Sequence, residues 1–174
     1  VTWYLDAPTP AVTMFPRGGA ARPLTIHRDQ GALRFDLSGV PVERVDKLEV
    51  RWPSQSLRTQ TLIDTPGIAS LSSDTSARAG AFLAPEDAPS HADAVVYLMR
   101  HLHSSDLRLL EAFHTNTRGG TLQTSPGGNG VSPINSIAVL SRADEIGAGR
   151  IDALQSARRI ARRYREDRDL SRLC

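Results

Sequence analysis

The stretch Leu57-Arg-Thr-Gln-Thr-Leu-Ile-Asp-Thr-Pro-Gly67 decides the fold, because an apolar strand stops abruptly in it at Asp-Thr-Pro-Gly. We expect Leu62 and Ile63 to carry this strand into a buried sheet, and the Pro-Gly pair to turn the chain directly after Asp64. Open α/β sheets bind ligands at this edge, outside the carboxyl ends of their strands. A carboxylate there can hold the waters of Mg²⁺, and a glycine amide can approach a terminal phosphate. The stretch therefore predicts a phosphate sensor made by Asp64, through water to the metal, and Gly67.

A second apolar strand ends in the same way. The run Ile134-Asn-Ser-Ile-Ala-Val-Leu140 is followed directly by Ser-Arg-Ala-Asp at 141–144. The two oxygens of such an aspartate can accept both the ring and the exocyclic N–H donors of guanine, whereas adenine would leave buried groups unpaired. The stem and guanidinium of Arg142 can lie over the base. We therefore interpret Ser141, Arg142 and Asp144 as guanine-binding residues, and the two motifs together predict GTP and Mg²⁺ as ligands. The alternative is a pair of ordinary strand-to-loop turns with capping aspartates.

Length and composition predict one globular domain with a substantial core. The 174 residues are 40% hydrophobic and 23% charged, as in soluble globular proteins, and no apolar run reaches the ~18 residues of a membrane span. The net charge of +2 comes almost wholly from arginine, since Lys47 is the only lysine. We interpret the arginines at 158, 159, 162, 163 and 165 as a solvated helix face, not a membrane or nucleic-acid patch, so we expect no nucleic-acid partner. Cys174 is the only cysteine, which excludes an internal disulfide.

The first part of the chain alternates β-type runs with turn clusters, which predicts an antiparallel meander. A proline follows the run that ends at Trp52, as is typical of an edge strand, and the strand through Asp64 is expected to be its neighbour. The expected elements are strands 1–5, 11–15, 23–27 and 33–37, a helical turn at 42–45, an edge strand at 48–52 and the strand 57–64.

Strands and helices alternate in the rest of the chain. The run 92–99 is almost continuously apolar, which is typical of a strand covered on both faces. The expected elements are a helix at 73–83, the strand 92–99, a helix at 104–114 with Leu107, Leu110 and Phe113 on one face, a loop at 115–133, the strand 134–140 and a helix at 151–167 with Ile151, Leu154, Ile160, Ala161 and Tyr164 on one side. This order predicts an α/β three-layer sandwich of the P-loop GTPase kind with an antiparallel N-terminal flank.

The phosphate-cradling loop Gly-x-x-x-x-Gly-Lys-[Ser/Thr] does not occur in these 174 residues, because no glycine run precedes Lys47. That loop follows the first, central strand of the fold, so we expect this strand to precede residue 1. The last strand, which helps to frame the guanine, is also expected to lie outside the chain. The sequence is therefore interpreted as a partial GTPase domain that lacks the first and last strands.

With these residues in view, the sequence resembles the dynamin-like GTPases of mycobacteria and related actinobacteria. The resemblance covers nearly the whole chain, and the loop 115–133 is its least similar part. It rests on Val1-Thr-Trp-Tyr4, Leu48-Glu-Val-Arg-Trp-Pro53, Ile63-Asp-Thr-Pro-Gly67, Asp93-Ala-Val-Val-Tyr-Leu98 and, most specifically, Ser141-Arg-Ala-Asp-Glu-Ile-Gly-Ala-Gly-Arg-Ile-Asp-Ala153.

The resemblance implies that Asp64 and Gly67 serve Mg²⁺ and the γ-phosphate, and that Arg142 and Asp144 serve the guanine. It places the phosphate loop and the residues that position the attacking water outside this chain, so no catalytic residue is expected within it. It further implies a dimer with a second copy or a paralogue through the GTPase domain, and a helical stalk outside the chain that contacts the membrane. The expected place is the cytoplasm, peripherally at the inner face of the plasma membrane, in membrane or cell-envelope maintenance.

A function of a different class stays open. The chain could be a GTPase-like interaction module that pairs with an intact paralogue and does not hydrolyse nucleotide. An in-frame phosphate loop upstream of these residues favours the enzyme, and a natural start near Val1 favours the module.

Overall fold

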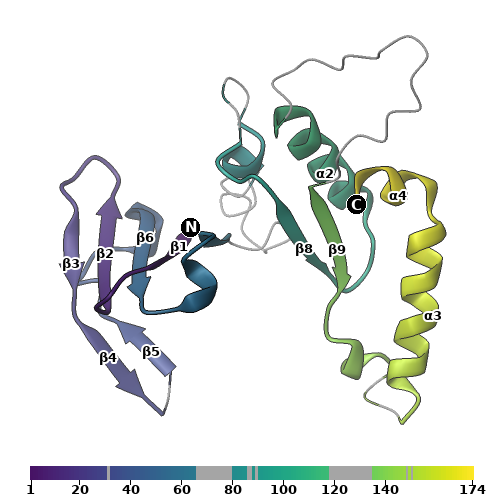
Figure 1. The fold of residues 1–174 in the computed structure, drawn as a ribbon, viewed down its shortest axis with the longest axis horizontal. Helices are drawn as coiled ribbons and strands as arrows, with labels where there is room; N and C mark the ends of the chain where they lie inside the picture. The colour runs from purple at the N-terminus through teal and green to yellow at the C-terminus, as the bar shows by residue number, and fades with distance from the viewer. Residues whose placement is uncertain are drawn as a thin grey trace. The chain divides into compact units, whose positions relative to one another are not determined.

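A computed structural model of the chain describes residues 1–30, 32–65, 80–85, 88, 90–117, 135–147, 149 and 151–174 (Figure 1). The chain is an α/β protein with a mixed sheet and several helices, which confirms the predicted class at this level. It divides into two compact units, Val1–Ala79 and Gly80–Cys174. Each unit has strands and an apolar core of its own.

The described part of the first unit consists mainly of strands. Its main sheet has the order β3-β2-β6-β1-β7, and β4 pairs with β5 in a separate hairpin. The elements are β1 (Thr2–Asp6), β2 (Ala11–Pro16), β3 (Arg22–Leu24), β4 (Ile26–Asp29), β5 (Ala32–Phe35), the 3₁₀ turn η1 (Val42–Arg44), β6 (Val45–Trp52), the 3₁₀ turn η2 (Gln55–Leu57) and β7 (Leu62–Asp64).

The predicted antiparallel meander is wrong in one respect that matters for the site. β1 lies between β6 and β7, runs parallel to β6 and antiparallel to β7, and does not pair with β2. The expected neighbours 48–52 and 57–64 are therefore separated by a strand. The connection 53–61 is longer than the two to five residues of a tight hairpin, so it can pass beyond β1 instead of folding straight back.

Burial in the first unit follows from this strand order. The core lies on one face of the sheet and contains Val12, Met14, Leu24, Val45 and Val50. Leu62 was expected to be buried, but 58% of it is exposed, because β7 is a three-residue strand at the sheet edge.

The only lysine is held by two aromatic rings. The Nζ atom of Lys47 lies 4.9 Å from the ring centroid of Trp3 and 4.4 Å from that of Phe15. It also lies 3.3 Å from Glu49 Oε2, and the Glu49 carboxylate accepts a 2.8 Å hydrogen bond from Arg51 Nε. Burial alone works to raise the pKa of Glu49, but the hydrogen bonds and charges of Arg51 and Lys47 outweigh it, so the pKa is lowered. These contacts join β1, β2 and β6 by cation–π and charge-assisted interactions.

The second unit begins with helical residues 80–83 and contains a parallel strand pair with helices. The parallel pairing agrees with the predicted alternation of strands and helices. The elements that follow are β8 (Val95–Met99), α2 (Ser104–Thr117), β9 (Ser136–Leu140), the 3₁₀ turn η3 (Ala143–Glu145), α3 (Ala153–Glu166) and α4 (Arg168–Leu173). Residues 73–79 of the expected helix and 118–133 of the expected loop lie outside the described residues.

Helix α2 confirms the predicted helix and its apolar face. Leu110 and Phe113 are fully buried, and Leu107 packs against the core formed by Met99, Leu110 and Leu170. The helix continues to Thr117, so residues 115–117 do not belong to the expected loop.

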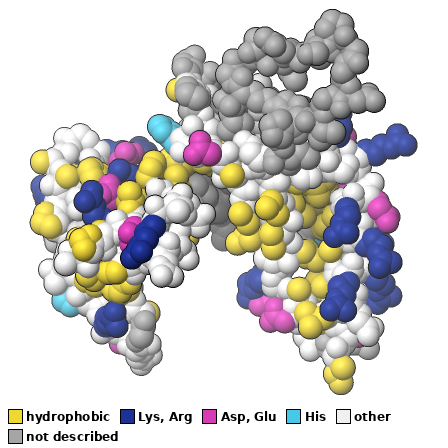
Figure 2. All heavy atoms as spheres, viewed as in Figure 1, with side chains coloured by type: hydrophobic (Ala, Val, Ile, Leu, Met, Phe, Trp, Pro, Cys, Tyr) yellow, Lys and Arg dark blue, Asp and Glu magenta, His cyan; other side chains and the backbone are white. Residues whose placement is uncertain are grey.

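Helix α3 exists as predicted, but the predicted apolar side is partly wrong. Its buried residues are Ala153 and Ala157, while Ile151 is fully exposed and Leu154 is 59% exposed. Small alanine side chains let the helix backbone approach the rest of the unit, which large side chains would prevent. Arginine side chains spread over the solvent side of this helix (Figure 2).

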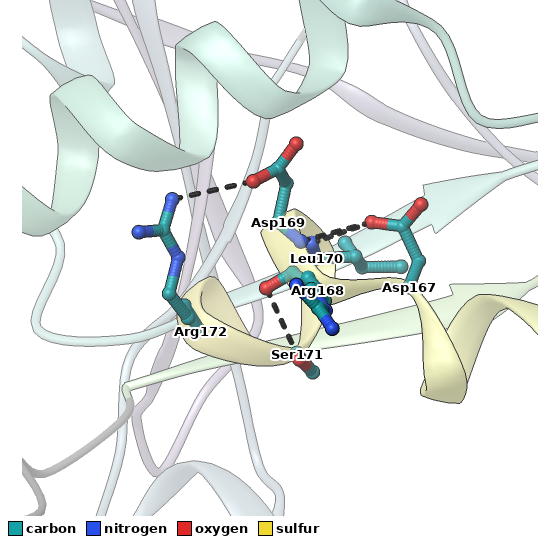
Figure 3. A network of polar contacts seen from close by, with 6 residues as sticks. All are labelled: Asp167, Arg168, Asp169, Leu170, Ser171 and Arg172. Carbon is teal, nitrogen blue, oxygen red and sulfur yellow. Dashed lines mark hydrogen bonds and ion pairs between the residues drawn. The ribbon is translucent and has the colours of Figure 1, made fainter.

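Helix α4 was not expected from the sequence. Asp167 caps it, because its Oδ1 atom accepts hydrogen bonds from the backbone N–H groups of Asp169 at 3.1 Å and Leu170 at 3.0 Å (Figure 3). Arg172 pairs with Asp169 at 3.3 Å on the exposed side. Leu170, only 4% exposed, belongs to the same buried cluster as Met99 and Leu110 and so fixes this short helix to the core.

Candidate functional site

Asp64 ends β7 and is exposed. Its backbone lies opposite Thr2 of β1, in antiparallel register. The pKa of the Tyr4 phenol is raised, first by burial and then by the negative charge of Asp64, which places the two side chains near one another. Within the described part of the chain, the Asp64 carboxylate has no hydrogen-bond or ion-pair partner. Gly67, the other predicted phosphate contact, lies outside the described residues.

Ser141 follows β9 and extends its pairing with β8. Its backbone N–H donates to the carbonyl of Met99 at 2.8 Å, and its hydroxyl donates to the same oxygen at 3.1 Å. Both bonds hold the start of the predicted guanine-binding turn against the sheet. The side chain of Ser141 therefore positions this turn through the backbone of the neighbouring strand.

Arg142 occupies the left-handed backbone region, with φ of +53°. A non-glycine residue in this region carries strain of about 1 kcal/mol or more, which is often found at functional turns. Its Nε atom donates to Glu145 Oε1 at 2.6 Å, and the other carboxylate oxygen of Glu145 lies 3.4 Å from Arg100 Nη2. The sequence prediction had missed Glu145, although an arginine and a glutamate three positions apart are a common pairing signal.

Asp144 lies in the middle of η3 and is exposed. Its neighbour Glu145 pairs with both Arg100 and Arg142. Asp144 has no hydrogen-bond or ion-pair partner among the residues described. Of the residues predicted to bind guanine, Asp144 alone presents a free acceptor pair at the carboxyl end of β9.

The predicted site residues fall into both units. Ser141, Arg142 and Asp144 are brought together in the second unit, and Asp64 belongs to the first. That the carboxylates of Asp64 and Asp144 converge on one ligand therefore stays a prediction. No cluster of three or more His, Cys, Asp or Glu side chains suited to a metal occurs in the described ranges. One free carboxylate fits Mg²⁺ that keeps most of its waters.

A pocket of about 270 Å³ lies elsewhere in the second unit, between β9, α3 and α4. Ser136 lines it, is 2% exposed, and its hydroxyl has no hydrogen-bond partner in the described structure. Cys174 also lines it; burial raises the pKa of its thiol, and a backbone hydrogen bond at Ala138 opposes this rise. None of the predicted site residues contributes to this pocket.

In the described part of the chain, none of the helices combines the length and the apolar character needed to cross a bilayer.

Comparison with known proteins finds the same mycobacterial protein in two strains. The chain is 43% identical over 175 aligned residues to the isoniazid-induced protein IniC of Mycobacterium tuberculosis, in both strain CDC 1551 / Oshkosh and strain ATCC 25618 / H37Rv. The similarity extends over 100% of this chain and 33% of each relative. No family model and no solved structure matches. The chain thus spans about a third of the length of the curated relatives it matches, and it is similar to isoniazid-induced protein IniC along its entire sequence.

Proposed function

We propose that this chain is part of a guanine-nucleotide-binding domain of the dynamin-like GTPase kind, with the fold of a P-loop GTPase. The observation that carries the proposal is the state of Asp144. Its carboxylate is exposed and unpaired within the described structure, at the carboxyl end of a parallel strand and two residues after the left-handed Arg142. Open α/β sheets bind ligands at this position.

The turn would supply two contacts to the base, and a third residue would hold the turn in place. The two oxygens of Asp144 would accept the N1–H and N2–H donors of guanine. Ser141 holds the turn through Met99. Arg142 would cover the base with its guanidinium. Its present pair with Glu145 is half exposed, and such surface pairs contribute only about 0–1 kcal/mol, so the arginine can leave it at little cost.

Asp64 and Gly67 would serve the phosphate end. Asp64 has an exposed, unpaired carboxylate in the described structure, which suits a ligand of the water shell of Mg²⁺. When bound, the ion would neutralise phosphate charge. Gly67 would approach the γ-phosphate through its backbone N–H.

The similarity to IniC supports a related function for this chain. Hydrolysis of GTP by the full-length protein, attachment to the inner face of the plasma membrane and a role in envelope maintenance are part of our proposal. We further propose that the domain pairs with a second copy or a paralogue.

The test uses the full-length gene product and the variant Asp144→Asn. An asparagine amide would donate to the C2 carbonyl of xanthine and would no longer accept two guanine donors. We expect affinity for GTP to fall, and the preference for xanthosine triphosphate to rise, by about tenfold or more, which corresponds to 1.4 kcal/mol per factor of ten. Asp169→Asn, an exposed change on α4, is the matched control and should leave both affinities unchanged.

Unchanged GTP affinity in Asp144→Asn would remove Asp144 from the site. Nucleotide binding without Mg²⁺-dependent release of phosphate would favour the non-hydrolysing interaction module over the enzyme. Isothermal titration calorimetry and a phosphate-release assay separate these outcomes.

A further inference from the structure

Glu145 connects the ends of the two parallel strands of the second unit. Its Oε1 atom accepts the Nε–H of Arg142 at 2.6 Å and also contacts Nη2 of the same arginine. Its Oε2 atom lies 3.4 Å from Nη2 of Arg100, the residue that follows β8. The two strands are neighbours, with Met99 opposite Leu140 at their ends. One carboxylate therefore pairs with an arginine from each strand end.

The end of β8 is anchored in the second unit. Met99 is 6% exposed and belongs to the core of this unit. In the loop that follows the strand, the backbone N–H of Leu102 donates to the phenol oxygen of Tyr164 on α3 at 3.2 Å. Val96 and Leu98, on the other face of β8, are 64% and 65% exposed, so the prediction of a strand covered on both faces is wrong for one face. β8 is thus held through its inner face and through the loop after it.

The side chain of Arg142 is held more loosely than its backbone. The backbone is fixed, because Ser141 donates twice to the carbonyl of Met99 and the N–H of Glu145 donates to the carbonyl of Arg142 at 3.0 Å. The side chain is 56% exposed, and within the described structure its guanidinium contacts only Glu145. Rotation of this side chain would therefore release the guanidinium without moving the turn.

Two arginines on one carboxylate have a consequence for a ligand at Asp144. The guanidinium of Arg142 has to leave Glu145 before it can lie over a base held by Asp144. Glu145 then keeps Arg100 as a partner, because each arginine pairs with a different oxygen. Without Arg100, the same step would leave an unpaired negative charge near an anionic nucleotide, which is unfavourable.

We propose that Glu145 and Arg100 are positioning residues that set the affinity of the guanine-binding turn. Glu145 holds Arg142 away from the base in the nucleotide-free protein, and Arg100 keeps the carboxylate neutralised when Arg142 turns to the ligand. The inference rests on the proposed function, since it concerns the same turn. Neither residue contacts the nucleotide, so both act through Arg142.

The first test is Glu145→Gln in the full-length gene product. Binding of a non-hydrolysable GTP analogue is measured by isothermal titration calorimetry with Mg²⁺. Glutamine keeps the size of the side chain and removes its charge, so affinity should rise by about two- to fivefold, because Arg142 no longer leaves an ion pair. Fivefold corresponds to about 1 kcal/mol, the upper end for a half-exposed pair. The preference for GTP over xanthosine triphosphate should not change, since Asp144 is intact.

The same substitution in an Arg142→Ala background separates release of the arginine from simple removal of charge. We expect Glu145→Gln to have no effect there, because no guanidinium is left to release. A general charge effect on the phosphates would act equally in both backgrounds. The difference between the two backgrounds is the coupling energy of the pair.

Arg100→Gln tests the second arginine. Affinity should fall by about two- to fivefold, because Glu145 is then left with Arg142 alone, and this loss should disappear when Glu145→Gln is also present. Arg172→Gln is the matched control. It removes the same charge and breaks a 3.3 Å exposed pair with Asp169 on α4, so it should leave the affinity unchanged.

Three results would overturn the proposal. They are an unchanged or lower affinity in Glu145→Gln, a gain of equal size in the Arg142→Ala background, and a loss in Arg100→Gln that persists with Glu145→Gln. Should Arg142→Ala bind too weakly to measure, the cycle of positions 100 and 145 decides alone. A native protein that binds no guanine nucleotide would remove the proposed function and this proposal together. Native binding that does not respond to Glu145→Gln would remove this proposal only.

Discussion

The phenol of Tyr97 on β8 donates a 2.7 Å hydrogen bond to Asp106 Oδ1 in the first turn of α2. The second oxygen of Asp106 accepts the backbone N–H of His103 at 2.9 Å, the residue that precedes the helix. Asp106 is 4% exposed, so both bonds are shielded from water. One carboxylate thus caps the start of α2 and fastens this helix to β8.

Tyr97→Phe should destabilise the chain by about 1.5–3 kcal/mol, the range for a hydrogen bond to a charged group, because it leaves a buried carboxylate with one donor fewer. Tyr164→Phe is the matched control. Its hydroxyl accepts the backbone N–H of Leu102, an uncharged donor, at 3.2 Å, so we expect a loss of about 0.5–1.5 kcal/mol. Urea denaturation followed by circular dichroism measures both. Equal losses would contradict the charge-assisted bond.

Alkaline pH should weaken the fold through the same tyrosine. Burial, and then the hydrogen bond to Asp106 and its charge, raise the pKa of Tyr97 in the folded state. The folded chain therefore keeps a proton that the unfolded chain loses, and the stabilisation present below about pH 10 is lost as pH rises above it. The urea midpoint of the native chain should fall between about pH 9 and pH 11, and Tyr97→Phe should show a smaller fall. Parallel curves would rule out Tyr97 as the cause.

Acidic pH should remove the stabilising contribution of the Glu49 ion pairs in the first unit. The pKa of Glu49 is lowered, because Arg51 and Lys47 outweigh the effect of burial. Its ion pairs therefore stabilise the fold above the ordinary carboxyl pKa of about 4 and lose that effect as pH falls through the folded-state pKa. Glu49→Gln should be less stable than the native chain at neutral pH, and the gap should narrow as pH falls below about 4. Asp29→Asn, which breaks an exposed pair with Arg34, should show almost no gap at either pH.

Asp167→Ala should loosen α4. The side chain satisfies two backbone donors at the start of this helix, and loss of such a cap costs about 0.5–2 kcal/mol. Asp169→Ala removes only an exposed pair with Arg172 and should cost less than about 0.5 kcal/mol. Hydrogen exchange at Leu170 and Ser171 reports the local effect. Faster exchange in Asp169→Ala than in Asp167→Ala would reverse the assignment of the cap.

Ser136→Ala should leave the stability unchanged or raise it by about 1 kcal/mol. Its hydroxyl is buried without a partner among the described residues, and such a group carries a desolvation cost that alanine avoids. Thermal unfolding measures the difference. A clear loss of stability would show that the hydroxyl is satisfied in solution, for example by a water in the adjoining pocket.

An element and its buried face could be predicted from the sequence where the local sequence signal and the packing agree. Helix α2 has a strong start signal and its apolar residues at helical spacing, so both its place and its buried face could be predicted. Helix α3 could be located but its face could not, because the contact is made by Ala153 and Ala157, whose small side chains carry little hydrophobic signal.

Long-range strand order was beyond local reasoning. Nothing in residues 45–64 alone indicates that β1 inserts between β6 and β7, since that choice depends on pairing with residues that lie far away along the chain, such as Thr2 with Leu48 and with Asp64. The candidate site was also predicted only in part. The position of Asp144 after a strand could be predicted from the sequence. The left-handed backbone of Arg142 and its pairing with Glu145 depend on the three-dimensional structure and could not be predicted.

Lys47 has a practical consequence for chemistry performed on the intact chain. Its ammonium contacts Trp3, Phe15 and Glu49 in the middle strand of the main sheet, and 29% of the side chain is exposed. Amine-directed dyes and cross-linkers should consequently modify Lys47 slowly while the sheet is folded. A lysine-specific endoprotease should cleave after Lys47 more slowly in the folded first unit than in the unfolded chain. The rate of cleavage at that bond would then measure how fast the first unit opens.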